Sequence, residues 1–284
     1  RGGSRRENRI VLPLDGTDSV EEILLYAPSI TPSDVTEIAL LTVVSDADSR
    51  ASGAAHADEV YEALNSAGWR ITREVRMGDP VDEIVKFAML MPANLLVMST
   101  HGRSGLERVR EGSVTEQVLR RSPCPVFILH STRAEPADKR VDDLFQRILV
   151  PLDGTEVSAA ILECVERFAH AHDSEIILFH DEMGDHENEE ARGVLREALQ
   201  EHSVKLANTG LKVSLDLSTY QRPIREILDK IDAMKIDLVA MATHSDSNTR
   251  QALEESVTAE VIRHSNCPLL VWSDDAQCVP EEAG

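Results

Sequence analysis

The stretch that decides the fold is Arg9-Ile-Val-Leu-Pro-Leu-Asp-Gly-Thr17, which returns as Arg147-Ile-Leu-Val-Pro-Leu-Asp-Gly-Thr155. Two later stretches recur in the same order. Ser113-Val-Thr returns as Ser256-Val-Thr, and Cys124-Pro-Val returns as Cys267-Pro-Leu. A self-similarity of this length indicates a duplicated domain, with short insertions in the second copy.

Each copy alternates short β-branched apolar runs with amphipathic stretches. In the first copy the pattern predicts strands at 10–14, 37–44, 70–76, 95–99 and 125–129, and helices at 19–29, 54–67, 80–91 and 113–121. Strands separated by helices require crossover connections, which produce a parallel sheet covered on both faces. The sequence therefore predicts two tandem doubly wound α/β domains, each a five-stranded parallel sheet of Rossmann-like type.

The repeat also sets the domain boundaries. We expect a flexible tail at 1–8, a first domain at 9–130, a linker at 131–146, a second domain at 147–275 and an acidic tail at 276–284.

Charge and composition exclude several classes of partner. The chain has 50 acidic and 29 basic residues, a formal net charge of −21. Such a surface lacks the basic stripe that a nucleic-acid backbone needs. It suits the salt-rich cytoplasm of a halophile, and an acidic protein from an ordinary cytoplasm is the alternative. No run approaches the roughly 18 apolar residues of a membrane span. The four cysteines form no CxxC pair, so we expect buried free thiols in a reducing cytoplasm.

The loop after the fourth expected strand has the features of an anion site. It contains Gly102 and Gly112 and leads into Ser113-Val-Thr-Glu116, a capping box that places a helix start at Ser113. The first backbone N–H groups of a helix lack partners and carry partial positive charge, and glycine lets a phosphate approach them. Doubly wound sheets bind ligands at the carboxyl ends of their strands, where this loop is expected.

These residues resemble the universal stress protein family, the UspA-like branch of the adenine-nucleotide alpha hydrolase-like folds. The family's phosphate motif is Gly, two residues, Gly, nine residues, Gly and then Ser or Thr. In this chain Ser99 stands in the first position, followed at the family's spacing by Gly102, Gly112 and Ser113.

The resemblance implies an ATP or AMP site in the first domain, with or without Mg²⁺. It implies that Asp15 contacts the ribose or adenine, that Val43 lines the base pocket, and that backbone amides and the Ser113 hydroxyl surround the phosphates. The full set of expected ligand-binding residues is Pro13, Asp15, Gly16, Thr17, Val43, Met98, Ser99, His101, Gly102, Arg103, Gly112, Ser113, Val114 and Thr115.

The second copy departs from the motif. Ser245 and Glu255 replace the second and third glycines, and Asp181 aligns near Val43. A carboxylate about 4 Å from a phosphate costs roughly 4 kcal/mol at an effective dielectric of 20, which exceeds its benefit to the helix start of about 0.3–1 kcal/mol. We therefore expect the second domain to bind no nucleotide and to be structural.

Three functional classes stay open at this point. The favoured one is a regulatory nucleotide binder of the stress response with an unknown protein partner. The others are a nucleotide-using enzyme, such as a weak ATPase or adenylyl transferase, and a nucleotide-free scaffold. No catalytic residue is assigned, because His101 has a twin, His244, in the copy without the motif. Asp15 also has a structural interpretation, as the first residue of an Asx turn.

The family resemblance implies that the two domains pair. UspA-like domains associate through their last strands, so 125–129 and 268–272 are expected to associate edge to edge, as in a dimer fused into one chain. The alternative is two domains joined by the linker without pairing, and a homodimer of the whole chain is left open.

Overall fold

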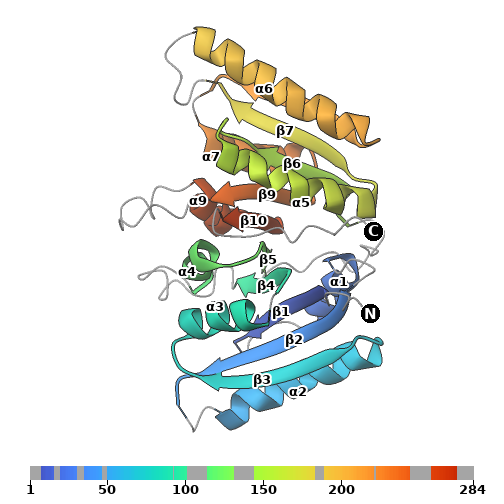
Figure 1. The fold of residues 1–284 in the computed structure, drawn as a ribbon, viewed down its shortest axis with the longest axis vertical. Coiled ribbons are helices and arrows are strands. Elements are labelled where there is room, and N and C mark those ends of the chain that lie inside the picture. The colour runs from blue at the N-terminus through green and yellow to red at the C-terminus, as the bar shows by residue number, and fades with distance from the viewer. Residues whose placement is uncertain are drawn as a thin grey trace, which may run out of the picture. The chain divides into compact units, whose positions relative to one another are not determined.

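In the computed structural model the described residues are 8–15, 20–30, 35–46, 50–91, 93–100, 114–130, 144–182, 189–220, 222–243 and 257–273. They divide into two units. Unit 1 has its described residues within 8–130 and unit 2 within 144–273. Strands and helices alternate along both (Figure 1).

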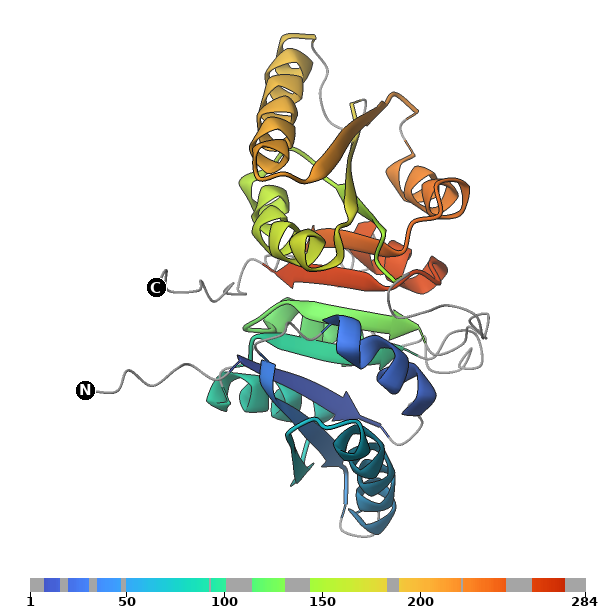
Figure 2. The same cartoon turned by 90° about the vertical axis from the view of Figure 1, so that its right-hand side faces the viewer.

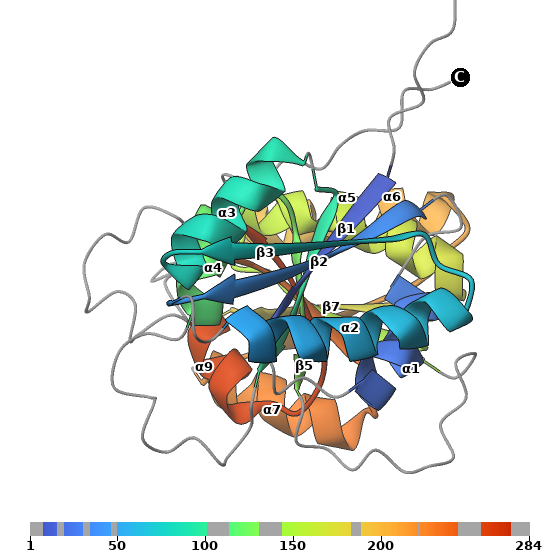
Figure 3. The same cartoon turned by 90° about the horizontal axis from the view of Figure 1, so that it is seen from below.

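Unit 1 is a parallel sheet covered by helices on both faces. Its described strands are β1 (Asn8–Leu14), β2 (Val35–Val44), β3 (Ile71–Met77), β4 (Leu95–Thr100) and β5 (Val126–His130), in the order β3-β2-β1-β4-β5. Its helices are α1 (Val20–Ile30), α2 (Arg50–Ser66), α3 (Pro80–Leu90) and α4 (Val114–Arg121). Helices α1 and α2 lie on one face, and α3 and α4 on the other (Figure 3).

Unit 2 repeats this arrangement. Its described strands are β6 (Arg147–Pro151), β7 (Glu175–Asp181), β8 (Lys212–Ser218), β9 (Leu238–Thr243) and β10 (Leu269–Ser273), in the order β8-β7-β6-β9-β10. Helices α5 (Glu156–His172) and α6 (Glu189–Asn208) cover one face, and α7 (Pro223–Ala233) and α9 (Val257–His264) cover the other (Figure 2). Two doubly wound α/β units, as the alternation of strands and helices predicts, are thereby confirmed.

Strand order fixes where a ligand can bind. In unit 1 the chain moves outward from β1 through β2 to β3, and then returns to the other side of β1 at β4. Helices α1 and α4, which follow β1 and β4, therefore lie on opposite faces of the sheet, and in doubly wound sheets such a reversal marks the place where ligands bind at the carboxyl ends of the strands. The same reversal occurs between β6 and β9 in unit 2.

The pairing registers confirm that the units are copies. Arg9 pairs with Glu37 in unit 1, and Arg147 pairs with Glu175 in unit 2. Ile10 pairs with Leu95, and Ile148 pairs with Leu238. Equivalent positions in the first two strands of the two units therefore differ by a constant offset, which allows residue-by-residue comparison.

Three expected boundaries are wrong by a few residues. Asn8, assigned to the tail, pairs with Val35 as part of β1. The expected linker, 131–146, extends too far, because Leu144 and Phe145 are buried and the Phe145 ring packs edge-on against Phe168 at 5.0 Å. Helix α2 begins at Arg50, four residues before the expected start at 54.

The central strands β1 and β6 are apolar along nearly their whole length because helices cover both faces of each sheet. Ile10, Val11 and Leu12 of β1 are all buried, as are Ile148, Leu149 and Val150 of β6. Within the described ranges, no helix is both long and apolar enough to cross a bilayer.

Candidate functional site

The carboxyl ends of β1, β2 and β4 in unit 1 bring together those described residues of the expected site that lie on these strands or directly after them. Leu14 of β1 pairs with Thr42 of β2, so Asp15 and Val43, each one residue further on, lie at the same level of the sheet. On the other side of β1, Val11 pairs with Leu96 of β4, the strand that ends in Ser99 and Thr100. Residues from three separate parts of the sequence therefore meet at the reversal of strand order.

The expected site residues differ in their exposure. Pro13, Met98 and Thr115 are buried, Val43 and Ser99 are half-buried, and Asp15 and Val114 are exposed. The remaining expected residues lie outside the described part of the chain: Gly16, Thr17, His101, Gly102, Arg103, Gly112 and Ser113.

Two hydroxyl groups near these strand ends lack hydrogen-bond partners among the described residues. They are Ser99 Oγ near the end of β4 and Thr42 Oγ1 near the end of β2, and both oxygen atoms are buried. A buried polar atom without a partner is costly, and functional sites are one place where such atoms occur. The sequence interpretation included Ser99 and missed Thr42, which no motif marks.

Helix α4 starts where the capping box predicts. Its first residue is Val114, directly after Ser113, and Thr115 and Glu116 in its first turn are buried. A carboxylate in the first turn of a helix interacts favourably with the helix dipole. The described residues therefore locate the start of α4 at Val114, whereas the expected capping residue, Ser113, lies outside the described part of the chain.

The turn after β6 in unit 2 shows what the repeated aspartate does there. Asp153 Oδ1 accepts hydrogen bonds from the Thr155 backbone N–H at 2.9 Å and from the Thr155 hydroxyl at 2.6 Å. Thr155 in turn caps α5 by accepting a hydrogen bond from the Ser158 backbone N–H at 3.1 Å. In unit 2 the aspartate therefore closes the strand–helix turn, which is the structural role considered for this position.

The end of β7 in unit 2 carries polar side chains that are buried. His180 Nδ1 donates a hydrogen bond to the Leu152 carbonyl at 2.7 Å, and Asp181 is buried beside it. Arg196 of α6 binds both oxygens of Glu182, with Nη2 at 2.7 Å from Oε2, and its Nη1 lies 3.0 Å from Glu189 Oε1. The hydrogen bond from Arg196 holds the pKa of Glu182 below its ordinary value.

Register makes the comparison of the two units precise. Pro13 pairs with Leu41 in unit 1, and the equivalent Pro151 pairs with Phe179 in unit 2. Two residues further along each second strand stand Val43 and Asp181, so these two positions are structurally equivalent. An apolar residue in unit 1 is replaced by a buried carboxylate in unit 2.

Fold and strand order define a tandem α/β protein of the doubly wound class. The model of the universal stress protein family matches residues 7–130 and 144–272. The chain belongs to the universal stress protein family, with two such domains in tandem.

Individual relatives agree with this assignment. Universal stress protein MJ0531 of Methanocaldococcus jannaschii is 31% identical over 151 residues, which cover 48% of this chain and 89% of the relative. Universal stress protein Rv2005c of Mycobacterium tuberculosis is 25% identical over 216 residues, 71% of this chain and 68% of the relative. The crystal structure of a universal stress protein from Archaeoglobus fulgidus matches 94% of this chain and 97% of its own, with 23% identity and a TM-score of 0.77, which supports the fold.

Proposed function

We propose that unit 1 binds ATP or AMP as a regulatory ligand at the carboxyl ends of β1, β2 and β4, and that unit 2 binds no nucleotide. Two observations carry the proposal: register brings Asp15 and Val43 to the same level at the reversal of strand order, and α4 begins at Val114, directly after Ser113 in the sequence. In this proposal the base of the nucleotide binds beside Asp15 and Val43, and its phosphates bind at the start of α4.

The phosphate end rests on the start of α4. Backbone N–H groups in the first turn of a helix are unpartnered donors with partial positive charge, and they bind phosphate oxygens. Gly112 leaves this approach free of a side chain, and the Ser113 hydroxyl adds a donor. The buried Ser99 hydroxyl at the end of β4 supplies a further polar group that has no partner within the described residues.

The base end rests on the end of β2. Val43 is half-buried and can offer an apolar surface to a flat ring, and the next residue, Val44, is also apolar but buried. In unit 2 the equivalents are Asp181 and Glu182, both acidic and buried. Asp153 is held in its turn by Thr155, and Glu255 stands where unit 1 has Gly112. These features support a structural role for unit 2.

A regulatory role is proposed over turnover because the sequence offers no paired nucleophile and base around the loop, and the loop histidine recurs in unit 2. A cytoplasmic location, Mg²⁺ accompanying the phosphates, a homodimer, and edge-to-edge pairing of 125–129 with 268–272 stay predictions of the sequence.

The binding test uses the whole chain. Protein denatured after purification is expected to release an adenine nucleotide, identified by chromatography, and calorimetry with ATP and AMP is expected to give one site per chain. Gly112→Glu, which copies Glu255, should weaken binding about a thousandfold, because a like charge about 4 Å away costs roughly 4 kcal/mol. Gly105→Glu is the matched control, since it adds the same charge to the same loop outside the motif.

Unchanged affinity in Gly112→Glu, or an equal loss in Gly105→Glu, would show that the phosphates bind elsewhere. Incubating the protein with an equimolar amount of ATP separates a binder from an enzyme. Recovery of intact ATP supports the regulatory proposal, and stoichiometric release of ADP or AMP contradicts it.

A further inference from the structure

Helices α2 and α6 occupy equivalent places, and their residues can be aligned one by one. Two residues after each helix ends stands a glycine with a left-handed backbone, Gly68 with φ 92° and Gly210 with φ 95°. Four residues before each glycine stands a buried leucine, Leu64 or Leu206. Counting back from these anchors, the residue of α6 that corresponds to Gly53 is Leu195.

In unit 2 Leu195 covers the turn between β6 and α5. Leu195 is 8% exposed, and its Cδ1 lies so close to Gly154 that a Cβ added there would collide with it. Gly154 also has a φ of 86°, which glycine adopts without strain. Two separate features therefore require glycine at position 154: its left-handed backbone conformation, and the Leu195 side chain that packs against it.

The next residue of α6 holds this packing in place. Arg196 binds Glu182, the residue that directly follows β7, and also binds Glu189 in the first turn of α6. The pair with Glu182 fixes the first half of α6 against the carboxyl end of the sheet, and the pair with Glu189, within α6, orients the Arg196 side chain. Leu195 and Arg196 together close the space between the β6–α5 turn and the end of β7.

In unit 1 the same positions carry small residues. Gly53 and Ala54 stand in place of Leu195 and Arg196, and Val44 stands in place of Glu182. Helix α2 comes so close to β2 that a Cβ on Gly53 would lie 2.8 Å from Thr42 Cγ2 and 3.3 Å from Val44 Cγ1. Gly53 and Ala54 have no side-chain atoms beyond Cβ that could extend over the turn after β1.

We propose that Gly53 and Ala54 keep the base end of the nucleotide site open in unit 1, and that Leu195 and Arg196 fill the equivalent space in unit 2. The proposal rests on nucleotide binding by unit 1. It assigns the closure of unit 2 to its own helix α6, a cause separate from the negative charge of Glu255. Position 53 is then a determinant of whether a unit of this fold admits a base.

The test installs the leucine of unit 2 in unit 1. Gly53→Leu should weaken ATP binding by about tenfold or more, because its side chain takes the volume that the base needs. Ala55→Leu is the matched control, since it adds the same side chain to an exposed position of the same helix. Because the new Cβ meets Thr42 Cγ2, Gly53→Leu is also made together with Thr42→Ser, which removes that methyl group, and is compared with Thr42→Ser alone.

Calorimetry with ATP and circular dichroism are measured on each variant. Loss of binding in folded Gly53→Leu or in the double variant, with Ala55→Leu unaffected, supports the proposal. Wild-type affinity in both folded leucine variants at position 53, or an equal loss in Ala55→Leu, overturns it and leaves the proposed function standing. A wild-type chain that binds no ATP overturns the proposed function itself, and this inference with it.

Discussion

Arg9, the first residue of the repeated stretch, anchors the amino end of the sheet in unit 1. Its Nε donates to Glu37 Oε2 at 2.8 Å, and its Nη1 donates to the Met91 carbonyl at 2.6 Å. The pair is well shielded, with side chains 14% and 5% exposed. Unit 2 repeats the pair as Arg147 and Glu175, but there the side chains are 46% and 40% exposed. The same ion pair therefore experiences two different environments in one molecule.

Glu37→Gln should lower the free energy of unfolding at pH 7 by about 2 kcal/mol, because a shielded hydrogen-bonded charge is lost. Burial alone would raise the pKa of Glu37, but hydrogen bonds from Arg9 and Thr72 and the nearby positive charges bring it below its ordinary value of 4.5. A lowered pKa means that the stabilisation is complete above the ordinary value and is lost as the pH falls through the folded-state value. The gap between wild type and variant in urea unfolding should therefore narrow below pH 4.5.

Glu175→Gln provides the control for this prediction. An exposed ion pair contributes about 0–1 kcal/mol, so this variant should be close to wild type at every pH. Equal losses in the two variants would show that shielding does not decide the strength of the pair.

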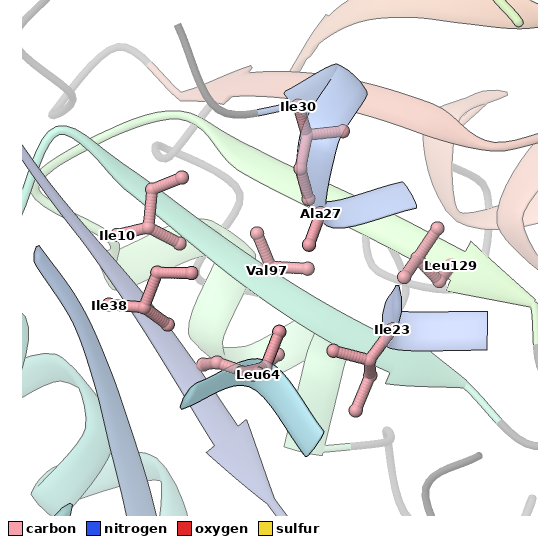
Figure 4. A pocket seen from close by; sticks show the side chains of 9 residues that line it. Ile10, Ile23, Ala27, Ile30, Ile38, Leu64, Val97 and Leu129 are labelled. Carbon is pink, nitrogen blue, oxygen red and sulfur yellow. The ribbon is translucent and has the colours of Figure 1, made fainter. Parts of the chain in front are cut away.

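An apolar cavity of about 20 Å³ lies between α1 and the sheet of unit 1. Its lining is entirely aliphatic (Figure 4): Ile10, Leu12, Ile23, Ala27, Ile30, Ile38, Leu64, Val97 and Leu129. A water molecule needs polar partners to occupy such a space, and the lining offers none. The side chains that line the cavity therefore lack some of the van der Waals contacts that a filled core would give them.

Val97→Ile should fill part of this cavity and raise the free energy of unfolding by about 0.8 kcal/mol, the value of one buried methylene. Val97 is 2% exposed and keeps its β-branched form in the substitution, so the strand preference is unchanged. Val11→Ile makes the same change at a fully buried position that does not line the cavity, and overpacking there should cost about 1–3 kcal/mol. Thermal unfolding measures the stability of both variants. A lower free energy of unfolding in Val97→Ile would mean that the cavity cannot accept the added methyl group.

At the scale of elements, the sequence predicts most boundaries because each strand and helix has a clear period and clear end residues. Helix α3 is an example: Asp79 caps it by accepting a hydrogen bond from the Asp82 backbone N–H at 3.0 Å, and Pro80 stands at its first position. Helix α2 is the exception. Gly53 lowers helix propensity by about 1 kcal/mol, so the pattern predicts a later start. Tertiary packing against Thr42 overrides that local preference.

The candidate site could be predicted only where a motif marks it. Asp15 and Val43 came from the family resemblance, and the register brings them to one level of the sheet. Thr42 and Gly53 carry no motif, because their importance arises from a contact between a strand and a helix distant in sequence. One signal was present in the sequence: aligning the copies through Gly68 and Gly210 shows glycine opposite Leu195.

At the scale of the whole molecule, charge dominates. A formal net charge of −21 on 284 residues places many carboxylates within repulsive range of one another. Such repulsion disfavours the compact state, and dissolved ions screen it. The screening length falls from about 10 Å at 0.1 M salt to about 3 Å at 1 M. The folded protein should therefore gain more from added salt than a protein with balanced charge.

Raising KCl from about 0.1 to about 1 M at pH 7.5 should increase the melting temperature by about 5 °C, equivalent to roughly 1–2 kcal/mol for a chain of this size. Near the isoelectric point of about 4.8 the net charge disappears, so the same addition of KCl should leave the melting temperature nearly unchanged. Differential scanning calorimetry at both pH values separates screening from a general effect of salt on apolar burial, because only screening depends on net charge. An equal rise at both pH values would assign the effect to apolar burial, and no rise at pH 7.5 would mean that the carboxylates do not destabilise the fold.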